Sequence, residues 1–351
     1  MRSSLLRSGF LRRSVLAAAL VAALSAAPRA ADRKLAIEWI DVLGGAATLI
    51  VTPAGEAILV DTGWPGNDSR DAKRIKEALD RHGVTAIDHL ILTHYHVDHY
   101  GGVAQLAALV PIRKFYDHGP MSELPEDKQF AQLYAAYRAA AKDTSTTLKP
   151  GSTIALKQSR GPKLSLTVLA AGGDVMTGAE TPQNPACASV TPQPDDTTDN
   201  RRSVTFVLRY GNFDFYDGGD LTGDVEARLV CPVDRVGPVD LYQVTHHGLA
   251  ISNSPVLLAT LKPTVAVMNN APRKGGEAET VARLKALPSL QGFFALHKNG
   301  ATAPEANADP RNTANTEAAG GLGFNAEVDA AAKQFTITNA RTKEIRTFAV
   351  K

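Results

Sequence analysis

The sequence predicts an α+β fold in which two β-sheets pack face to face and helices cover their outer surfaces, a four-layer αββα sandwich. Short apolar strands come in meanders, amphipathic helices are interspersed among them, and this arrangement occurs in both halves of the chain. No fixed-period repeat and no clear linker divides the chain. We therefore expect one domain over residues 32–351, ending in a β-hairpin near 334–350.

The first half begins with short predicted strands near 35–42, 47–51 and 57–60, and the third strand ends in Asp61-Thr62-Gly63. An amphipathic helix is expected over 68–82, because Gly83 stands just past its end. A buried strand over 87–92 then runs directly into His94. The remaining expected elements of this half are helices over 103–109 and 126–142 and strands over 154–156 and 164–169.

The second half begins with a long segment, residues 172–200, that is rich in Gly, Pro, Thr, Asn and Asp and is expected to be an irregular loop. A hairpin follows around Gly211-Asn212, and a strand over 241–244 leads into Thr245-His246-His247-Gly248. Helices are expected over 255–261 and 277–286, strands over 264–268 and 292–296, and a loop over 301–323.

The first 31 residues have the layout of a secretory signal peptide. A positive segment ends in Arg12-Arg13, an apolar run covers 15–24, and small residues follow. The arginine pair leaves two routes open, an ordinary secretory signal and a twin-arginine signal. The run is about half of the roughly 20 residues that a membrane span needs. We expect a periplasmic or secreted protein with no membrane segment. Cys187 and Cys231 can pair in such a compartment, but the sequence leaves their pairing open.

Composition does not select a substrate. Hydrophobic residues make up 44% of the chain, enough for a full core. The net charge of +2 provides no basic field of the kind that binds nucleic acid.

The segment from Thr93 to Gly102 carries the strongest chemical pattern. His94 and His96 lie two positions apart in an extended chain, so their side chains face the same way and can hold one metal ion together. The chain then turns, which directs Asp98 and His99 to a neighbouring position. Three imidazoles and a carboxylate within six positions suit zinc or another divalent metal of similar character.

Two later segments add ligand-type residues at the ends of strands. Asp220 lies in Gly218-Gly219-Asp220-Leu221-Thr222-Gly223-Asp224, where a carboxylate can bridge two metals. Alone, this segment is interpreted as a Gly/Asp turn. The pair His246-His247 follows the strand over 241–244, and alone it is equally weak.

Together, the order Asp-Thr-Gly, HxHxDH, Gly-Asp and late histidine resembles the metallo-β-lactamase superfamily over residues 35–296. The resemblance implies that fold and a two-metal centre. It matches His94 and His96 to one metal, Asp98 and His99 to the other, Asp220 to the bridge, and Asp61 to a support behind the ligands. His246 or His247 matches the last ligand. We assign His246 to the metal and keep His247, together with Asp98, for proton transfer.

One histidine of the family pattern is missing. It is expected about twenty residues before the bridging aspartate, where this chain has Asn200. Asn200 is the first candidate to replace it, with Asp196 and Asp199 as alternatives. This departure resembles the branch that contains the soluble hydrolase domain of bacterial DNA-uptake (competence) channel proteins. His118 and Arg201 are candidates for substrate contact, although a solvated loop is the more ordinary interpretation of Arg201.

The resemblance implies a metal-dependent hydrolase with two divalent ions, Zn²⁺ first and Mn²⁺ or Fe²⁺ as alternatives, and a bridging hydroxide as nucleophile. A small-molecule phosphoester, a phosphodiester above all, is the first substrate expectation. A lactone, amide or β-lactam is the second. A protein of another class, a metal- or substrate-binding module with a decayed site, is the third, because of the missing histidine.

Overall fold

The computed structural model describes residues 33–178, 183–191, 193–317 and 319–351. The expected signal peptide over 1–31 lies outside the described residues. Within the described ranges, no helix combines the length and the apolar character needed to cross a membrane.

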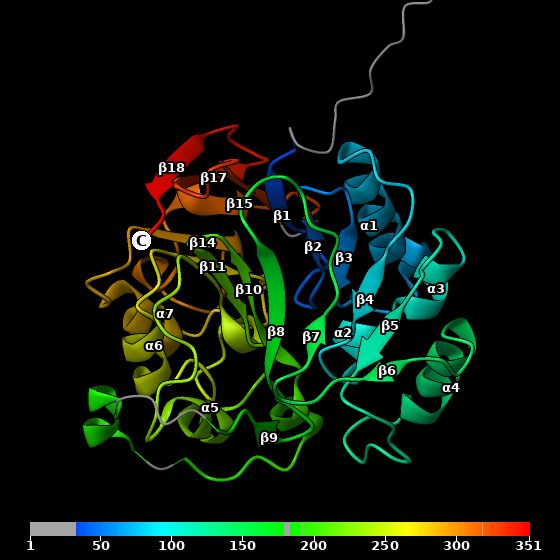
Figure 1. Ribbon diagram of the computed structural model, residues 1–351, viewed down its shortest axis with the longest axis horizontal. Coiled ribbons are helices and arrows are strands. Elements are labelled where there is room, and N and C mark those ends of the chain that lie inside the picture. The colour runs from blue at the N-terminus through cyan, green and yellow to red at the C-terminus, as the bar shows by residue number, and fades with distance from the viewer. Residues whose placement is uncertain (1–32, 179–182, 192, 318) are drawn as a thin grey trace, which may run out of the picture.

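Two nine-stranded sheets form the centre of the molecule (Figure 1). The first has the order β18-β17-β16-β1-β2-β3-β4-β5-β6, and the second has β15-β14-β13-β12-β11-β10-β8-β7 with β9 paired to β8. The strands of the first sheet are β1 (Leu35–Trp39), β2 (Thr48–Val51), β3 (Ala57–Val60), β4 (His89–Ile91), β5 (Phe115–Asp117), β6 (Thr146–Thr147), β16 (Phe324–Val328), β17 (Gln334–Asn339) and β18 (Ile345–Ala349). Those of the second are β7 (Thr153–Ile154), β8 (Leu164–Ala171), β9 (Asp174–Val175), β10 (Thr205–Tyr210), β11 (Phe213–Asp217), β12 (Leu241–Gln243), β13 (Val265–Met268), β14 (Gly292–His297) and β15 (Thr313–Asn315).

Helices cover the outer face of each sheet. Figure 1 shows α1, α3 and α4 on one side of the pair of sheets and α5, α6 and α7 on the other. The helices are α1 (Arg70–Arg81), α2 (Val97–Tyr100), α3 (Val103–Ala107), α4 (Phe130–Ala140), α5 (Gly223–Val230), α6 (Pro255–Leu261) and α7 (Ala278–Lys285). This is the predicted αββα sandwich.

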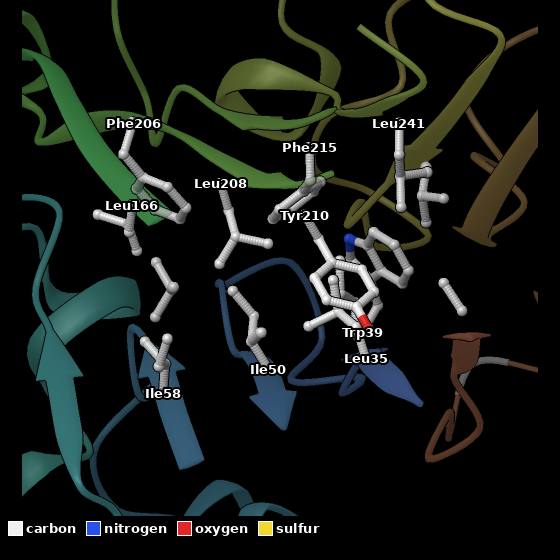
Figure 2. Packing of buried hydrophobic residues seen from close by; sticks show 14 of the residues in the cluster. Leu35, Trp39, Ile50, Ile58, Leu166, Phe206, Leu208, Tyr210, Phe215 and Leu241 are labelled. Carbon is white, nitrogen blue, oxygen red and sulfur yellow. The ribbon is translucent and has the colours of Figure 1, made fainter. Parts of the chain in front are cut away.

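Three apolar cores separate the four layers, and the alternation of side chains along the strands produces them. In β2, Ile50 points into the core between the sheets, whereas Leu49 and Val51 belong to the core under α1, α3 and α4. Figure 2 shows the central core, where Ile50 faces Leu208 of the other sheet. The third core joins the second sheet to α5, α6 and α7.

The strands that carry the chemical motifs run parallel. β3, β4 and β5 are parallel in the first sheet, as are β11, β12, β13 and β14 in the second. Their carboxyl ends lead directly to the HxHxDH, Gly-Asp and His-His segments. The topology thus brings motifs distant in sequence to one edge of the sandwich.

The expected elements differ from the structure in several places, and strands β5 and β16 are among the elements that were not expected. The helix expected over 126–142 begins only at Phe130, because Glu126 lies in the preceding turn and its carboxylate accepts from the backbone of Asp199. β15 lies inside the expected loop over 301–323. Helix α5 was not expected, because its Gly- and Asp-rich start was interpreted as a turn. It forms because Val225 and Leu229 are buried in the third core.

Candidate metal centre

The centre is built from three chain segments at the carboxyl ends of strands. His94 follows β4, and Asp98 and His99 lie in the short helix α2. Asp220 follows β11, and the pair His246-His247 forms part of a 3₁₀ turn (Thr245–Gly248) after β12. All these side chains are buried, whereas His96, the other histidine of the HxHxDH segment, is partly exposed.

Asp220 is the point on which four imidazoles converge. Its Oδ2 lies 4.0 Å from Nε2 of His94 and 3.2 Å from Nε2 of His99. The same oxygen lies 3.5 Å from Nε2 of His246 and 3.3 Å from Nε2 of His247. A single carboxylate oxygen surrounded in this way is placed to bridge two cations.

A second carboxylate joins two of these imidazoles. Oδ2 of Asp98 lies 3.2 Å from Nε2 of His247 and 3.5 Å from Nε2 of His99, and the two Nε2 atoms are 3.1 Å apart. Atoms that bind one zinc ion at about 2.0–2.2 Å lie about 3–4 Å from each other. Asp98, His99 and His247 therefore form one group with the spacing of ligands to a single metal, and His94, His99 and Asp220 form another.

The histidines of the first group direct their Nε2 atoms toward the centre. Nδ1 of His99 donates to Oδ2 of Asp61 at 2.7 Å, and Nδ1 of His247 faces the carbonyl oxygen of Asn269 at 3.3 Å. A carboxylate and a carbonyl only accept, so Nδ1 carries a proton in both rings. Their Nε2 atoms face carboxylate oxygens; burial opposes the charged form of His99, but Asp220, Asp61 and Asp98 raise its pKa well above its usual value. A divalent cation bound at this place would replace the Nε2 proton.

The same reasoning applies to His94 and His246. Thr93 donates its hydroxyl proton to Asp61 at 2.7 Å, so its Oγ1 can accept from Nδ1 of His94 at 3.1 Å. Ser252 donates to the carbonyl of Leu221 at 2.7 Å and can accept from Nδ1 of His246 at 3.0 Å. Nε2 of His94 is buried and has no hydrogen-bond partner within the described part of the chain. The donor set thus fits divalent metal ions.

The neighbouring imidazoles and Lys274 control the pKa values of the two carboxylates in the centre. Burial alone would raise the pKa of Asp220, but the facing imidazoles of His247, His99 and His246 hold it well below its usual value. Burial likewise opposes ionisation of Asp98, and His99 and Lys274 lower its pKa well below the usual range. Both carboxylates are therefore ionised at neutral pH, as metal ligands must be.

Three residues of the centre have left-handed backbone conformations. φ is 61° at Asp61, 55° at His246 and 53° at His247. Such conformations are uncommon for residues other than glycine and are found where the surrounding structure fixes a functional side chain. Gly275 packs so closely on the backbone of His247 that a β-carbon at this position would collide with it.

The structure separates His96 and His246 from the two groups of three. Nε2 of His96 lies 3.5 Å from Oε1 of Glu126, and the imidazole is 20% exposed. His247, not His246, lies beside Asp98 and His99, which is the reverse of the assignment expected from the sequence. Nδ2 of Asn200 lies 3.4 Å from Nε2 of His246, and Oδ1 of Asn200 is buried without a partner in the described structure.

The alternatives near Asn200 are engaged elsewhere. Oδ2 of Asp199 accepts from the backbone of Tyr95 at 2.7 Å and from Nε2 of His118 at 3.0 Å. Asp196 accepts from the hydroxyl of Thr198 at 2.7 Å.

The two residues expected at the substrate are also occupied. His118 is buried, pairs with Asp199 and packs on the ring of Tyr95 at 4.5 Å between centroids. Arg201 is 3.7 Å from Asp224. A surface cavity of about 320 Å³ lies beside this region, lined by Glu126, Asp199 and Arg202 among others.

Sequence reasoning missed Lys274, Glu126 and Ser252. Lys274 contacts the carboxylate of Asp98 across 176 positions of sequence, so no local spacing could indicate it. Ser252 could have been noticed as a hydroxyl residue soon after the His-His pair.

A disulfide joins Cys187 to Cys231. The sequence left this pairing open. The bond ties the loop that leads to Asn200 to the end of α5, and Asn184 in the same loop donates to the carbonyl of Val230 at 2.9 Å.

Residues 40–183 match the model of the metallo-beta-lactamase superfamily. The chain is similar to Recombination protein 2 of Haemophilus influenzae, with 27% identity over 237 residues that cover 67% of this chain and 24% of that protein. It is also similar to an atrochrysone carboxyl ACP thioesterase of Pseudocercospora fijiensis, with 39% identity over 90 residues that cover 26% of either chain. The matches thus span about a quarter of the length of these two relatives.

Among solved structures, the metallo-beta-lactamase fold protein YhfI from Bacillus subtilis aligns with a TM-score of 0.43 at 12% identity, covering 74% of this chain and 95% of that protein.

Proposed function

Because the chain carries a metallo-β-lactamase superfamily domain and is a metal-dependent hydrolase of that superfamily, we propose that its substrates are small phosphoesters, with phosphodiesters the preferred class. The observation that carries the chemistry is the convergence of four imidazole Nε2 atoms on Oδ2 of Asp220. Two divalent ions held there would supply an acidified water and a positive field at the attacked centre.

The chain's own residues divide into holding and proton-transfer roles. Asp98, His99 and His247 would hold one ion, and His94, His99 and Asp220 would hold the other. His246 lies next to Asp220 without belonging to either group of three. Burial lowers the pKa of His246 to about 4, so its Nε2 is unprotonated at neutral pH and is placed to accept a proton. We therefore exchange the two roles expected from the sequence, giving His247 to the metal and His246 to proton transfer.

Two considerations support phosphoesters. The longer of the two matches is to a protein named for recombination, a process that acts on nucleic acids, whose strands are joined by phosphodiesters. The branch resemblance found in the sequence points to the same chemistry. The chain's charge balance argues against nucleic acid itself, so a small phosphodiester fits better.

A carboxylic substrate is the second candidate. It is favoured by the match to a thioesterase. This match has a higher identity than the match to Recombination protein 2, 39% against 27%, but it extends over only 90 residues. Lactones, amides and β-lactams belong to the same class, because their carbonyl carbon is attacked in the same way. Zinc, manganese and iron are all compatible with the nitrogen and oxygen donors, and zinc is proposed first.

The test compares Asp220→Ala with Asp214→Ala. Asp214 lies on β11, the strand that leads to Asp220, but its carboxylate faces Arg209 at 3.3 Å outside the centre. We expect wild type and Asp214→Ala to bind about two metals by plasma mass spectrometry and to cleave bis-p-nitrophenyl phosphate. Asp220→Ala should lose both metals and at least about 100–1,000-fold in kcat, the loss seen when a single electrostatic stabiliser is removed.

Three results would count against the proposal. Full metal content in Asp220→Ala would show that Asp220 does not bridge two metal ions. Wild-type turnover of p-nitrophenyl thioesters without phosphodiester turnover would favour the carboxylic class. A wild type with one metal or none and no turnover would favour the binding module.

We also propose that the protein is exported. The composition of residues 1–31 and the Cys187–Cys231 disulfide support an oxidising compartment. Fractionation of expressing cells with N-terminal sequencing tests this. A cytoplasmic protein that keeps Met1 would contradict it.

A further inference from the structure

A tight turn between β13 and α7 carries Lys274 to the metal centre. The backbone N–H of Ala271 donates to the carbonyl of Lys274 at 2.8 Å and closes the turn. The N–H of Gly276 donates to the carbonyl of His247 at 2.8 Å, and the side chain of Asn299 donates to the carbonyl of Gly275 at 2.7 Å. The turn is thus fastened to the histidine loop itself, so the position of Lys274 follows that of His247.

The aliphatic part of the Lys274 side chain packs against the loop that contains Gly44. A β-carbon at Gly44 would lie 2.8 Å from Cβ of Ala271 and 3.3 Å from two stem carbons of Lys274. The missing side chain at Gly44 therefore leaves room for the lysine to cross this loop. The ammonium lies 5.2 Å from the ring centroid of Trp64, within the range of a cation–π interaction. These contacts fix the position of the Lys274 side chain, whereas a surface lysine without them rotates freely.

The head of Lys274 is both charged and accessible. Its ammonium forms an ion pair with Oδ2 of Asp98, the same oxygen that faces His99 and His247. The side chain is 35% exposed, whereas that of Asp98 is 8% exposed. An incoming molecule can therefore reach the ammonium from solvent at the edge of the centre.

The ion pair with Asp98 uses a carboxylate that also belongs to the metal group. When Asp98 is engaged in holding a divalent ion, its negative charge is shared with that ion. The ammonium of Lys274 then keeps a positive charge with less compensation, directly beside the place where substrate is attacked. Such a charge favours an anion. Arg201, the residue expected from the sequence to contact substrate, is already paired with Asp224.

We propose that Lys274 is a specificity-determining residue that binds an anionic oxygen of the substrate beside the Asp98–His99–His247 group. The ligand class is a phosphoester that carries at least one negative charge. This inference rests on the proposed function for the identity of the anion. The competing role is purely structural, in which Lys274 serves only to neutralise Asp98.

The experiment compares Lys274→Met, Lys274→Arg and a control, Lys76→Met. Lys76 is an exposed lysine of α1 that pairs with Asp80 at 2.7 Å, so its replacement causes the same change in charge away from the centre. Each zinc-loaded variant is assayed for metal content, for inorganic phosphate affinity by calorimetry, and for kinetics on bis-p-nitrophenyl phosphate and on uncharged p-nitrophenyl acetate.

We expect Lys274→Met to keep its metals, to bind phosphate about tenfold more weakly or worse, and to show a similar rise in KM for the charged ester. The uncharged ester should be affected less than about twofold, because it offers no anionic oxygen to the lysine. Lys274→Arg should recover most of the phosphate affinity, and Lys76→Met should match wild type.

Three outcomes would overturn the inference. They are unchanged phosphate affinity in Lys274→Met, an equal loss on charged and uncharged esters, or a loss of metal that accounts for the loss of binding. A wild type that binds phosphate without cleaving the diester would refute the proposed substrate class. Lys274 would still be judged by its effect on phosphate affinity.

Discussion

The two halves of the metal centre differ in how completely the chain builds them. On one side, Asp98, His99 and His247 lie 3.1–3.5 Å from one another. On the other side, Nε2 of His94 is 4.0 Å from Asp220, and His96 faces Glu126. The comparison indicates that the ligand-type atoms are packed more tightly in the first half than in the second.

The difference follows from what supports each half. His99 and His247 are oriented by Asp61 and by a backbone carbonyl, groups fixed by the ends of β3 and β13. The other half depends on Asn200, which lies in a 3₁₀ turn (Asp199–Arg202) at the end of a long loop. Partners held by strands position a ligand more firmly than partners held by a loop.

The largest expected effect separates the two halves directly. We expect His247→Ala to abolish the tighter site, with metal affinity there reduced by at least about 100-fold, because losing a ligand costs no less than losing a residue that orients one. His94→Ala should spare that site and lose only the weaker ion. Competition with a chromophoric chelator, together with plasma mass spectrometry, measures both affinities. Equal losses in the two variants would mean that the halves do not differ.

A second variant tests the missing histidine. We expect Asn200→His to supply an imidazole next to His246, which itself lies 3.5 Å from Asp220, and to raise the affinity of the weaker ion by about tenfold, the lower end of the effects seen when a site's surroundings are changed. The affinity at the Asp98 group should stay the same. Asn200→Ala is the matched control and should not gain affinity. An unchanged second affinity in Asn200→His would show that His246 or water already fills this place.

Much of this arrangement could be predicted from local sequence. The strand before His94, the turn at Gly101-Gly102 and the spacing within the HxHxDH segment are local features, and they indicated both the fold and the core of the centre. The short apolar runs at 47–51 and 57–60 likewise predicted strands, and in the structure these strands are buried between two apolar layers.

What the sequence could not provide depends on tertiary contacts. His246 and His247 are adjacent and chemically identical, and only their left-handed turn decides which one faces Asp98. The rotation of His96 toward Glu126 and the approach of Lys274 to Asp98 join segments 30 and 176 positions apart. Helix α5 was missed because its start resembles a turn, and only packing against the second sheet reveals its apolar face.

The smallest expected effect concerns the support of His246, on the less complete half. Glu226 in α5 is fully buried and accepts from the backbone N–H groups of Asn253 at 2.8 Å and Ser254 at 2.7 Å. These residues follow Ser252, which orients His246. Burial raises the pKa of Glu226 to about 7, although the N–H donors of Ser254 and Asn253 oppose the shift.

A raised carboxyl pKa means that the folded protein holds a proton that the unfolded chain has already lost between about pH 4.5 and pH 7. Stability contributed by this group is therefore full below about pH 4.5 and is lost as pH rises through about 7, by up to about 3 kcal/mol. Glu226→Gln cannot titrate, so the difference in unfolding free energy between wild type and variant should change by that amount between pH 4.5 and 8 in urea titrations. Its value at low pH measures the altered hydrogen bonds alone. If the difference is constant with pH, Glu226 is ionised throughout this range. The loop behind His246 would then be held by a charged carboxylate, as His99 is held by Asp61. The two halves of the centre would in that case be supported in a more similar way than their geometry suggests.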